Sequence, residues 1–285
     1  MKPSITRRAV SETIAATLLS GFMPRPLAAG DERREPSTPV RDWPNDRTTG
    51  VQAGTELALH SGNMTIDTPN AVIRGLDIRG TVIVKAAGVT IEQCRVTAVN
   101  PWDWFVILTL NDTVVRNCTI DGGNVNSGQN AINGSGTFID NNIFNTENGI
   151  APGSNTTIEG NYIHDLRAPG SAHYDGIQMD GNQSDVVIRR NTIINSWPQT
   201  SAVMINNWAG PVSNVLIEDN LLLGGSYTIY VDGRFNKNPI SGVIIRGNHL
   251  GGGRYGHLYR SNSVPLLANN SLDGLAVMQS IGLLR

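Results

Sequence analysis

Short apolar stretches alternate with polar residues along most of the chain, and one seven-residue pattern recurs about nine times. Residues 187–193 show it clearly: Ile188 and Ile193 are apolar, two arginines follow Ile188, and Asn191 is the pivot. The apolar stretches are short, often β-branched and bounded by Gly, Asn and Pro, which favours strands over helices. The nine pivots are Leu76, Cys94, Cys118, Asn142, Asn161, Asn191, Asn220, Asn248 and Asn270.

The pivots lie 18 to 30 residues apart, a length that holds one coil of two or three short strands. Stacking such coils pairs each strand in parallel with its equivalent in the next coil, about 4.8 Å away. An asparagine at a sharp corner tolerates the left-handed conformation and hydrogen-bonds neighbouring backbone. The repeat therefore predicts an all-β fold, a right-handed single-stranded parallel β-helix (a solenoid) of about nine coils, with an asparagine ladder of left-handed pivots.

A second row of strands is expected about ten residues after each pivot. Its apolar residues Ile177, Val203 and Ile229 are predicted to point inward, so that their neighbours point outward. The expected outward residues are Gln178, Met204 and Tyr230, followed by Asp180, Asn206 and Asp232. If residues 225–227 and 253–255 are in register, the next coil is predicted to place Arg260 near Asp232. The connecting loops differ in length, and loops of this kind often form one functional face.

The first 28 residues are predicted to be an export signal and not part of the fold. Lys2, Arg7 and Arg8 precede a weakly apolar stretch. The two adjacent arginines are typical of a twin-arginine signal, with an ordinary secretory signal as the alternative. Residues 29–48, rich in Pro, Arg and Asp, are predicted to be a flexible lead-in, and residues 49–285 to form the β-helix domain. The expected location is therefore periplasmic or extracellular.

Composition narrows the classes of partner. Of the 285 residues, 31 are Gly and only 16% are charged, which suits tight turns better than helices. The formal net charge is −2, and loss of residues 1–28 leaves 18 basic and 23 acidic residues. A general nucleic-acid-binding surface is therefore not expected. The apolar stretch near the N-terminus is too short for a membrane span. The protein is expected to be a monomer.

The chain has two cysteines, Cys94 and Cys118, and both occupy pivot positions. Two cysteines are too few for a disulfide scaffold, and their spacing does not fit a zinc site. The first interpretation is that they are small buried residues that replace asparagine and stack on each other. A disulfide between coils and a reactive thiol are the two alternatives.

Together these features resemble the right-handed β-helix proteins of the pectate-lyase-like superfamily, over roughly residues 48–280. The segments TGVQAGT at 49–55, TPNAVI at 68–73 and HYDGIQMDG at 173–181 are similar to those of an uncharacterised group of secreted bacterial members. The superfamily includes polysaccharide lyases, glycoside hydrolases, epimerases and phage depolymerases. The resemblance thus implies a polysaccharide as substrate or ligand, while the fold alone does not select the reaction.

Polar and aromatic side chains gather in the later, longer coils, and they supply the candidate site. Lyase chemistry on an acidic polysaccharide is the first interpretation, because β-elimination needs a base, an acid and a group that neutralises the substrate carboxylate. In lyases of this fold the base is often Arg or Lys, with His or Tyr in other roles. The predicted catalytic residues are His173, Tyr174, Asp175, Asp180, Asp232, Arg234 and Arg260.

Hydrolysis by a pair drawn from the three aspartates is the second interpretation. The pattern requires no cofactor; if a metal is used, it is Ca²⁺ held by Asp175, Asp180 and Asp232. A carbohydrate-binding or envelope structural protein without catalysis is the third, because Asp-Gly pairs are also ordinary turns and tryptophans also cap loops. The predicted substrate-binding residues are Gln178, Trp197, Asn206, Trp208, Tyr230 and Tyr259.

Overall fold

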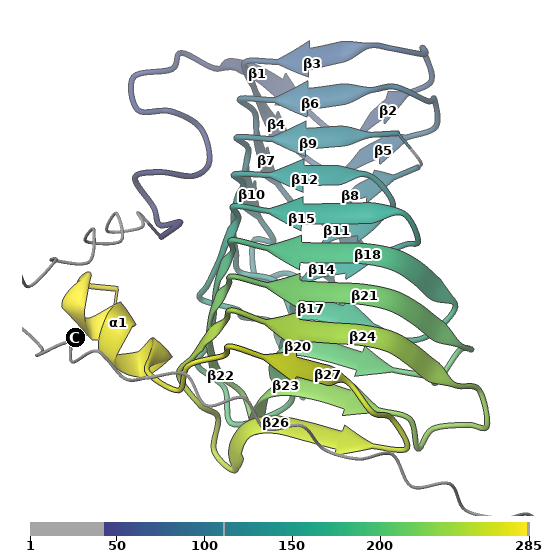
Figure 1. The fold of residues 1–285 in the computed structure, drawn as a ribbon. Helices are drawn as coiled ribbons and strands as arrows, with labels where there is room; N and C mark the ends of the chain where they lie inside the picture. Colours follow the sequence, from purple (N-terminus) through teal and green to yellow (C-terminus); the bar gives the residue numbers. More distant parts are fainter. Residues whose placement is uncertain (1–42, 111, 284–285) are drawn as a thin grey trace, which may run out of the picture. The chain divides into compact units, whose positions relative to one another are not determined.

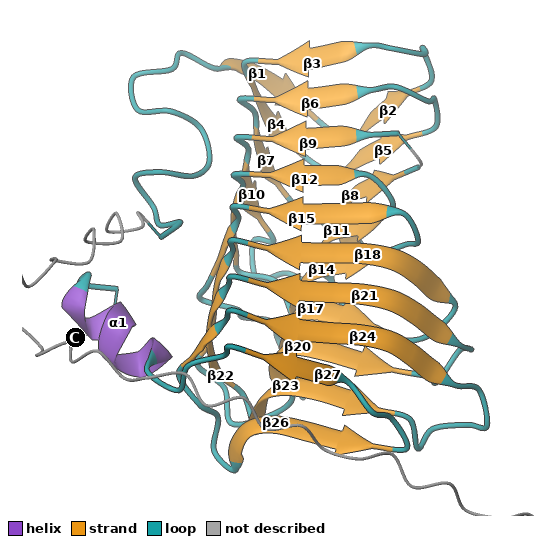
Figure 2. Cartoon of the chain, in the orientation of Figure 1, coloured by secondary structure: helices purple, strands orange, loops and turns teal. Residues whose placement is uncertain are grey.

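The computed structural model describes residues 43–110 and 112–283. The predicted export signal and residues 29–42 of the predicted lead-in lie outside the described residues. The described part of the chain forms three parallel sheets of nine strands each, together with one short helix, α1 (Gly274–Ser280) (Figures 1 and 2). The predicted fold class and the predicted number of coils are therefore confirmed.

Each coil contributes one strand to each sheet, in the chain order A, B, C. Sheet A contains β1 (Ala58–Ser61), β4 (Leu76–Arg79), β7 (Arg95–Thr97), β10 (Thr119–Asp121), β13 (Asn142–Phe144), β16 (Tyr162–Ile163), β19 (Thr192–Asn195), β22 (Leu221–Gly224) and β25 (His249–Leu250). Sheet B contains β2 (Met64–Ile66), β5 (Val82–Val84), β8 (Phe105–Thr109), β11 (Asn130–Gly134), β14 (Asn148–Pro152), β17 (Asp175–Met179), β20 (Ser201–Asn206), β23 (Tyr227–Asp232) and β26 (Gly256–Ser261). Sheet C contains β3 (Val72–Arg74), β6 (Thr90–Glu92), β9 (Val114–Arg116), β12 (Thr137–Ile139), β15 (Thr156–Glu159), β18 (Gln183–Arg189), β21 (Val212–Glu218), β24 (Ile240–Arg246) and β27 (Leu266–Ala268).

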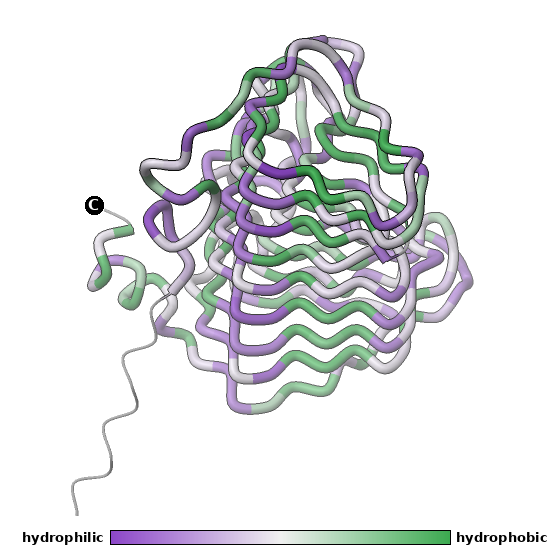
Figure 3. The backbone as a smooth tube through the Cα atoms, turned by 90° about the horizontal axis from the view of Figure 1, so that it is seen from above, coloured by the Kyte–Doolittle hydropathy of each residue, from purple (hydrophilic) through white to green (hydrophobic). Residues whose placement is uncertain are grey.

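The core consists of apolar side chains stacked in rows along the axis, one row from each sheet. In sheet B, Ile177 pairs with Val203 and Val203 with Ile229, and all three are fully buried, as predicted. Each buried Ile or Val side chain contributes about 1.5–3 kcal/mol relative to an exposed one. Figure 3 shows the consequence along the axis: hydrophobic segments recur at the same places from coil to coil, and hydrophilic segments lie between them.

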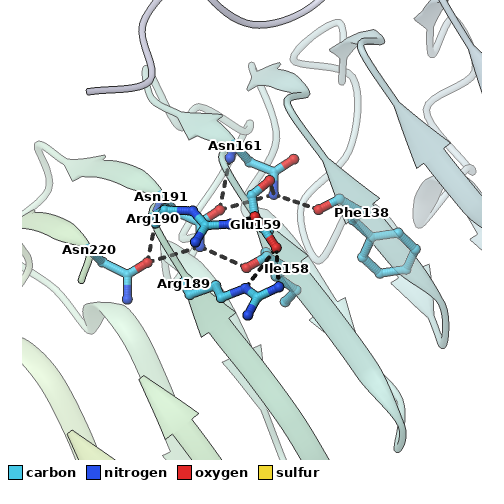
Figure 4. A network of polar contacts seen from close by, with 8 residues as sticks. All are labelled: Phe138, Ile158, Glu159, Asn161, Arg189, Arg190, Asn191 and Asn220. Atoms are coloured by element: carbon cyan, nitrogen blue, oxygen red, sulfur yellow. Dashed lines mark hydrogen bonds and ion pairs between the residues drawn. The ribbon is translucent and has the colours of Figure 1, made fainter. Parts of the chain in front are cut away.

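A buried asparagine ladder joins the coils at the corner between sheets C and A. The Oδ1 atom of Asn191 accepts from the backbone N–H of Asn161 (2.9 Å), and its Nδ2 atom donates to the carbonyl of Ile158 (3.0 Å) (Figure 4). The same two bonds recur at Asn220 and Asn248. Each ladder side chain therefore satisfies two backbone groups at the corner one coil earlier, which would otherwise be unpaired in the core.

Two details of the predicted ladder are wrong. The fourth pivot is Asn141, which is fully buried and aligned with Asn161, and not Asn142, which begins β13. The doublet of asparagines concealed this register, which the pairing of Phe138 with Ile158 fixes. The left-handed residue is also the one before the pivot, so that the pivot side chain can point inward. These left-handed residues are Gly75, Gln93, Asn117, Asp140, Gly160, Arg190, Asp219, Gly247 and Asn269.

Cys94 and Cys118 occupy the ladder positions of two consecutive coils as free, fully buried thiols. The Sγ atom of Cys118 lies 3.6 Å from the carbonyl of Ile91, the position equivalent to the acceptor of an asparagine Nδ2. Burial raises the pKa of the Cys118 thiol, which disfavours the reactive thiolate. The interpretation of stacked buried residues thus agrees with the structure.

A column of alternating charges crosses the outer face of sheet C. Its register runs Arg74, Glu92, Arg116, Ile139, Glu159, Arg189, Glu218 and Arg246. Glu159 contacts both Arg189 and Arg190 (Figure 4). Opposite charges on neighbouring strands stabilise the native register, because a one-residue slip would separate them.

The N-terminal end of the described chain runs along the outside of sheet A before β1. Trp43 is buried, and its ring lies 5.3 Å from that of His249 in β25. Further along, Gly50 donates to the carbonyl of Asp140 at 2.8 Å. Helix α1 adds Met278 to the cluster around Trp43. Within the described residues, no helix is long and apolar enough to cross a membrane.

Replacement of Asn191 by Ala should lower the free energy of unfolding by roughly 3 kcal/mol, because it leaves a buried N–H and a buried C=O without partners. Urea unfolding followed by circular dichroism measures this difference. Asn238→Ala is the matched control, since Asn238 is exposed and its unfolding free energy should change by less than about 0.5 kcal/mol. Equal losses in the two variants would contradict the assigned role of the ladder.

Candidate functional site

An open pocket of about 330 Å³ lies on the outer face of sheet B, across coils 6 to 8. Its floor is formed by outward side chains of β17 and β20. One wall comes from the turns that enter sheet B, and the other from the turns that leave it. The lining residues are His173, Asp175, Gln178, Asp180, Thr200, Met204, Asn206, Trp208 and Phe235.

Asp180 is held in a fixed position on the pocket floor. Its Oδ1 atom accepts hydrogen bonds from Asn206 Nδ2 at 2.7 Å and from Gln178 Nε2 at 3.3 Å. Its backbone carbonyl accepts from the N–H of Ala209 at 2.6 Å. Because two amide donors meet one carboxyl oxygen, the group is oriented before any ligand arrives.

Two exposed aromatic rings form the wall on the exit side of sheet B. Trp208 is 68% exposed and Phe235 is 53% exposed. Fully buried Asn207 holds the loop that carries Phe235, since its Oδ1 accepts from the Phe235 N–H at 3.1 Å and its Nδ2 donates to the carbonyl of Asn238 at 2.6 Å. The rings are therefore presented to solvent from an ordered backbone.

Asp175 belongs to a second, shorter polar ladder at the start of sheet B. Asn148 donates to Asn130 Oδ1 at 3.1 Å, and its own Oδ1 accepts from the Asp175 N–H at 3.2 Å. One coil further, Asp175 Oδ1 accepts from the N–H and the hydroxyl of Ser201, at 2.9 and 2.7 Å. A carboxyl group thus stands where the preceding coils place asparagine.

Asp175 is 1% exposed, and burial raises the pKa of its carboxyl group to about 8. The hydrogen bonds from Ser201 oppose the shift without cancelling it. At neutral pH Asp175 is therefore mostly a neutral acid that lines the same pocket as Asp180. A protonated carboxyl group has the shape and hydrogen-bonding pattern that the ladder position receives from asparagine elsewhere.

The next two coils extend the floor of the pocket with tyrosines. Tyr230 and Tyr259 follow Met204 in register, and their ring centroids lie 5.1 Å apart. Arg234 lies over the Tyr259 ring, 5.0 Å from its centroid, and forms a two-point ion pair with buried Asp232. Asp232 and Arg234 are thus adjacent to the pocket and engaged with each other.

Several predicted site residues lie elsewhere. Arg260 pairs with Val231 and not with Asp232, because it occupies the inward-facing parity of β26; the predicted proximity is wrong. Tyr174 is buried, donates from its hydroxyl to the carbonyl of Ala168, and stacks on Trp197 with centroids 4.4 Å apart. Both aromatic residues fix loops, and Trp197 lines a neighbouring pocket.

The structure therefore brings six predicted residues together: His173, Asp175, Gln178, Asp180, Asn206 and Trp208. Thr200 and Phe235 also line this pocket, and no sequence pattern marked either of them. The three aspartates proposed for Ca²⁺ do not converge, since Asp232 pairs with Arg234. Among the described residues, no group of three or more His, Cys, Asp or Glu side chains is arranged to hold a metal ion.

Asp175 should make stability fall as pH rises. The folded state holds its proton up to about pH 8, whereas an unfolded Asp releases it near pH 4. The unfolding free energy should therefore decline between about pH 4 and pH 8. Asp175→Asn removes this part of the slope while it preserves the ladder. The melting temperatures of the wild type and of Asp175→Asn are measured from pH 4 to pH 9, and Asp185→Asn, at an exposed position, is the control. If the wild type and Asp175→Asn give parallel curves, the raised pKa of Asp175 is refuted.

Comparisons with known proteins agree with this architecture. A family model described as "Right handed beta helix region" matches residues 59–196. No curated protein matches the sequence. A solved structure titled "Crystal structure of Agl-KA catalytic domain" is similar, with a TM-score of 0.55 and 16% sequence identity. The match covers 76% of this chain and 50% of that one, so this chain spans half the length of the structure it matches. The sheets, the ladder and these matches together show that the chain is a right-handed parallel β-helix protein.

Proposed function

We propose that this chain is a polysaccharide-active enzyme that hydrolyses a glycosidic bond in the pocket on sheet B. The observation that carries the proposal is that a neutral carboxyl group, Asp175, and a positioned carboxyl group, Asp180, line the same pocket. Two carboxyl groups with different environments are what acid–base cleavage of a glycosidic bond requires. The similar solved structure is described as a catalytic domain, which supports an enzymatic role.

The aromatic wall supports a carbohydrate as the ligand. Trp208 and Phe235 offer flat apolar surfaces on which the C–H face of a sugar ring can stack. The amides of Gln178 and Asn206 are within reach of sugar hydroxyls at the floor. A mixture of exposed rings and convergent polar groups is typical of ligand sites.

In the proposed reaction, Asp175 donates its proton to the glycosidic oxygen as the bond to the anomeric carbon breaks. Asp180 either takes a proton from a water that attacks the anomeric carbon, or attacks the anomeric carbon itself. In the second case, a water that gives its proton to the Asp175 carboxylate then displaces Asp180 from the anomeric carbon and releases the sugar. The first route inverts and the second retains the anomeric configuration, so the configuration of the product distinguishes them.

Lyase chemistry, the first interpretation of the sequence, receives less support from the pocket. Elimination needs a positive group to neutralise the uronate carboxylate. Among the described residues, no Arg or Lys lines this pocket, and the nearby Arg234 already pairs with Asp232. Binding without catalysis is the remaining alternative, since the second ladder explains the position of Asp175 by structure alone.

A panel of neutral, acidic and mixed polysaccharides tests the proposal. Hydrolysis yields new reducing ends without the ultraviolet absorbance of an unsaturated sugar, which β-elimination would produce. Asp175→Asn and Asp180→Asn should each lower kcat by about a hundredfold to ten-thousandfold. Asp185→Asn, an exposed carboxyl group on sheet C, should leave kcat unchanged.

The pH dependence gives a second check on the role of Asp175. Because the acid must be protonated, kcat should fall about tenfold per pH unit above pH 8. Glycan binding without any product, or full activity of Asp175→Asn, would exclude Asp175 as the acid.

A further inference from the structure

A second pocket, of about 210 Å³, lies beside the first, on the turns that enter sheet B in coils 7 to 9. Its lining residues are Asn195, Ser196, Trp197, Pro198, Gly224, Gly225, Gly252, Gly253 and Arg254. Thr200 lines the first pocket and Trp197 lines the second. An extended backbone spans at most about 3.6 Å per residue, so Trp197 and Thr200, which are close in the sequence, are also close in space. The two pockets can therefore bind neighbouring sugars of one polysaccharide chain.

The second pocket has the opposite electrostatic character to the first. Arg254 is its charged side chain, and no acidic side chain is among the described residues that line it. Arg254 forms no ion pair within the described part of the chain, and its guanidinium lies 5.2 Å from the centre of the Tyr255 ring. By contrast, Arg74, Arg116, Arg189 and Arg246 on sheet C each contact a glutamate.

The other walls of the second pocket suit a sugar ring. Trp197 is 40% exposed, one side of its indole stacks on Tyr174, and its N–H donates to the carbonyl of Leu166 at 2.6 Å. The ring is therefore rigid. The glycines at 224–225 and 252–253 leave a floor of bare backbone, because a Cβ at Gly224, Gly225 or Gly253 would collide with carbonyl oxygens. A flat ring and an exposed cation beside an open floor fit a sugar that carries an anionic group.

We infer that the second pocket is a subsite for an anionic sugar, with its carboxylate or sulfate at Arg254 and its ring against Trp197. The inference rests on the proposed function and specifies its substrate. The first pocket contains the Asp180 carboxylate and, among the described residues, no Arg or Lys, so it favours a neutral sugar. The substrate is then a heteropolysaccharide in which neutral and anionic sugars are neighbours, and not a homopolymer of uronates.

Binding to the Asp175→Asn variant tests the inference without turnover, since this change removes the proton donor and leaves the pocket charge at neutral pH unaltered. Isothermal titration calorimetry compares two mixed polymers, hyaluronan and xanthan, with neutral dextran and with polygalacturonate. At least one mixed polymer should bind most tightly. Adding Arg254→Gln should weaken that binding about tenfold or more, because a charge-assisted hydrogen bond is lost.

Arg254→Lys should retain part of the affinity, and Arg95→Gln, the same change at an exposed arginine of sheet A, should retain all of it. The inference is overturned if neither mixed polymer binds more tightly than both homopolymers, or if Arg254→Gln leaves the affinity unchanged. Arg254-dependent binding without product from the wild-type chain would refute the hydrolase proposal alone. Cleavage that is indifferent to Arg254 would refute the subsite alone.

Discussion

The hydrogen bond from a backbone N–H of one coil to a buried side-chain oxygen of the next is the contact on which this structure depends. A sharp corner between sheets C and A leaves backbone groups inside the core, where water cannot reach them. The side-chain oxygens of Asn191, Asn220 and Asn248 accept from these backbone N–H groups in turn. Because the corner is the same in every coil, the strands on both sides are held in register. Length variation is then confined to the two other corners, and the turns that line both pockets lie there.

The same contact explains how a carboxyl group came to be buried beside a pocket. The shorter ladder through Asn130, Asn148 and Asp175 requires only an acceptor oxygen for the next N–H. Aspartic acid meets that requirement in its neutral form, and the low polarity of the core keeps it neutral. Structure and chemistry therefore impose the same demand on Asp175. A buried aspartic acid at this position has the same structure whether it only completes the ladder or also acts as a general acid. Asparagine has the same shape and keeps the ladder but has no acidic proton, so Asp175→Asn separates the two roles.

The sequence predicted the fold almost completely, because the inward rows and the ladder depend on local patterns that repeat. It misplaced the fourth pivot, since Asn141 and Asn142 are chemically identical and only the pairing of Phe138 with Ile158 distinguishes them. The candidate site was harder to predict from the sequence than the fold. Strand alternation placed Gln178 and Asn206 correctly, yet Phe235 comes from a loop whose course depends on the buried amide of Asn207. The predicted register of Arg260 was wrong by one residue. In a strand, a shift of one residue moves the side chain to the opposite face of the sheet.

The three faces of the β-helix differ in what they leave available to a ligand. Sheet A is partly covered, by the segment that begins at Trp43 and by α1. Sheet C presents alternating charges that are already paired, so a polyanion gains little there from arginines that it must first separate from glutamates. Sheet B and its entry turns differ, because Asp180 is held by amides and not by a cation, and Arg254 lies on a tyrosine and not on an acid. Within the described residues, Asp180 and Arg254 each have no counterion, and they lie on neighbouring pockets. A ligand that supplies both a neutral and an anionic sugar complements this arrangement.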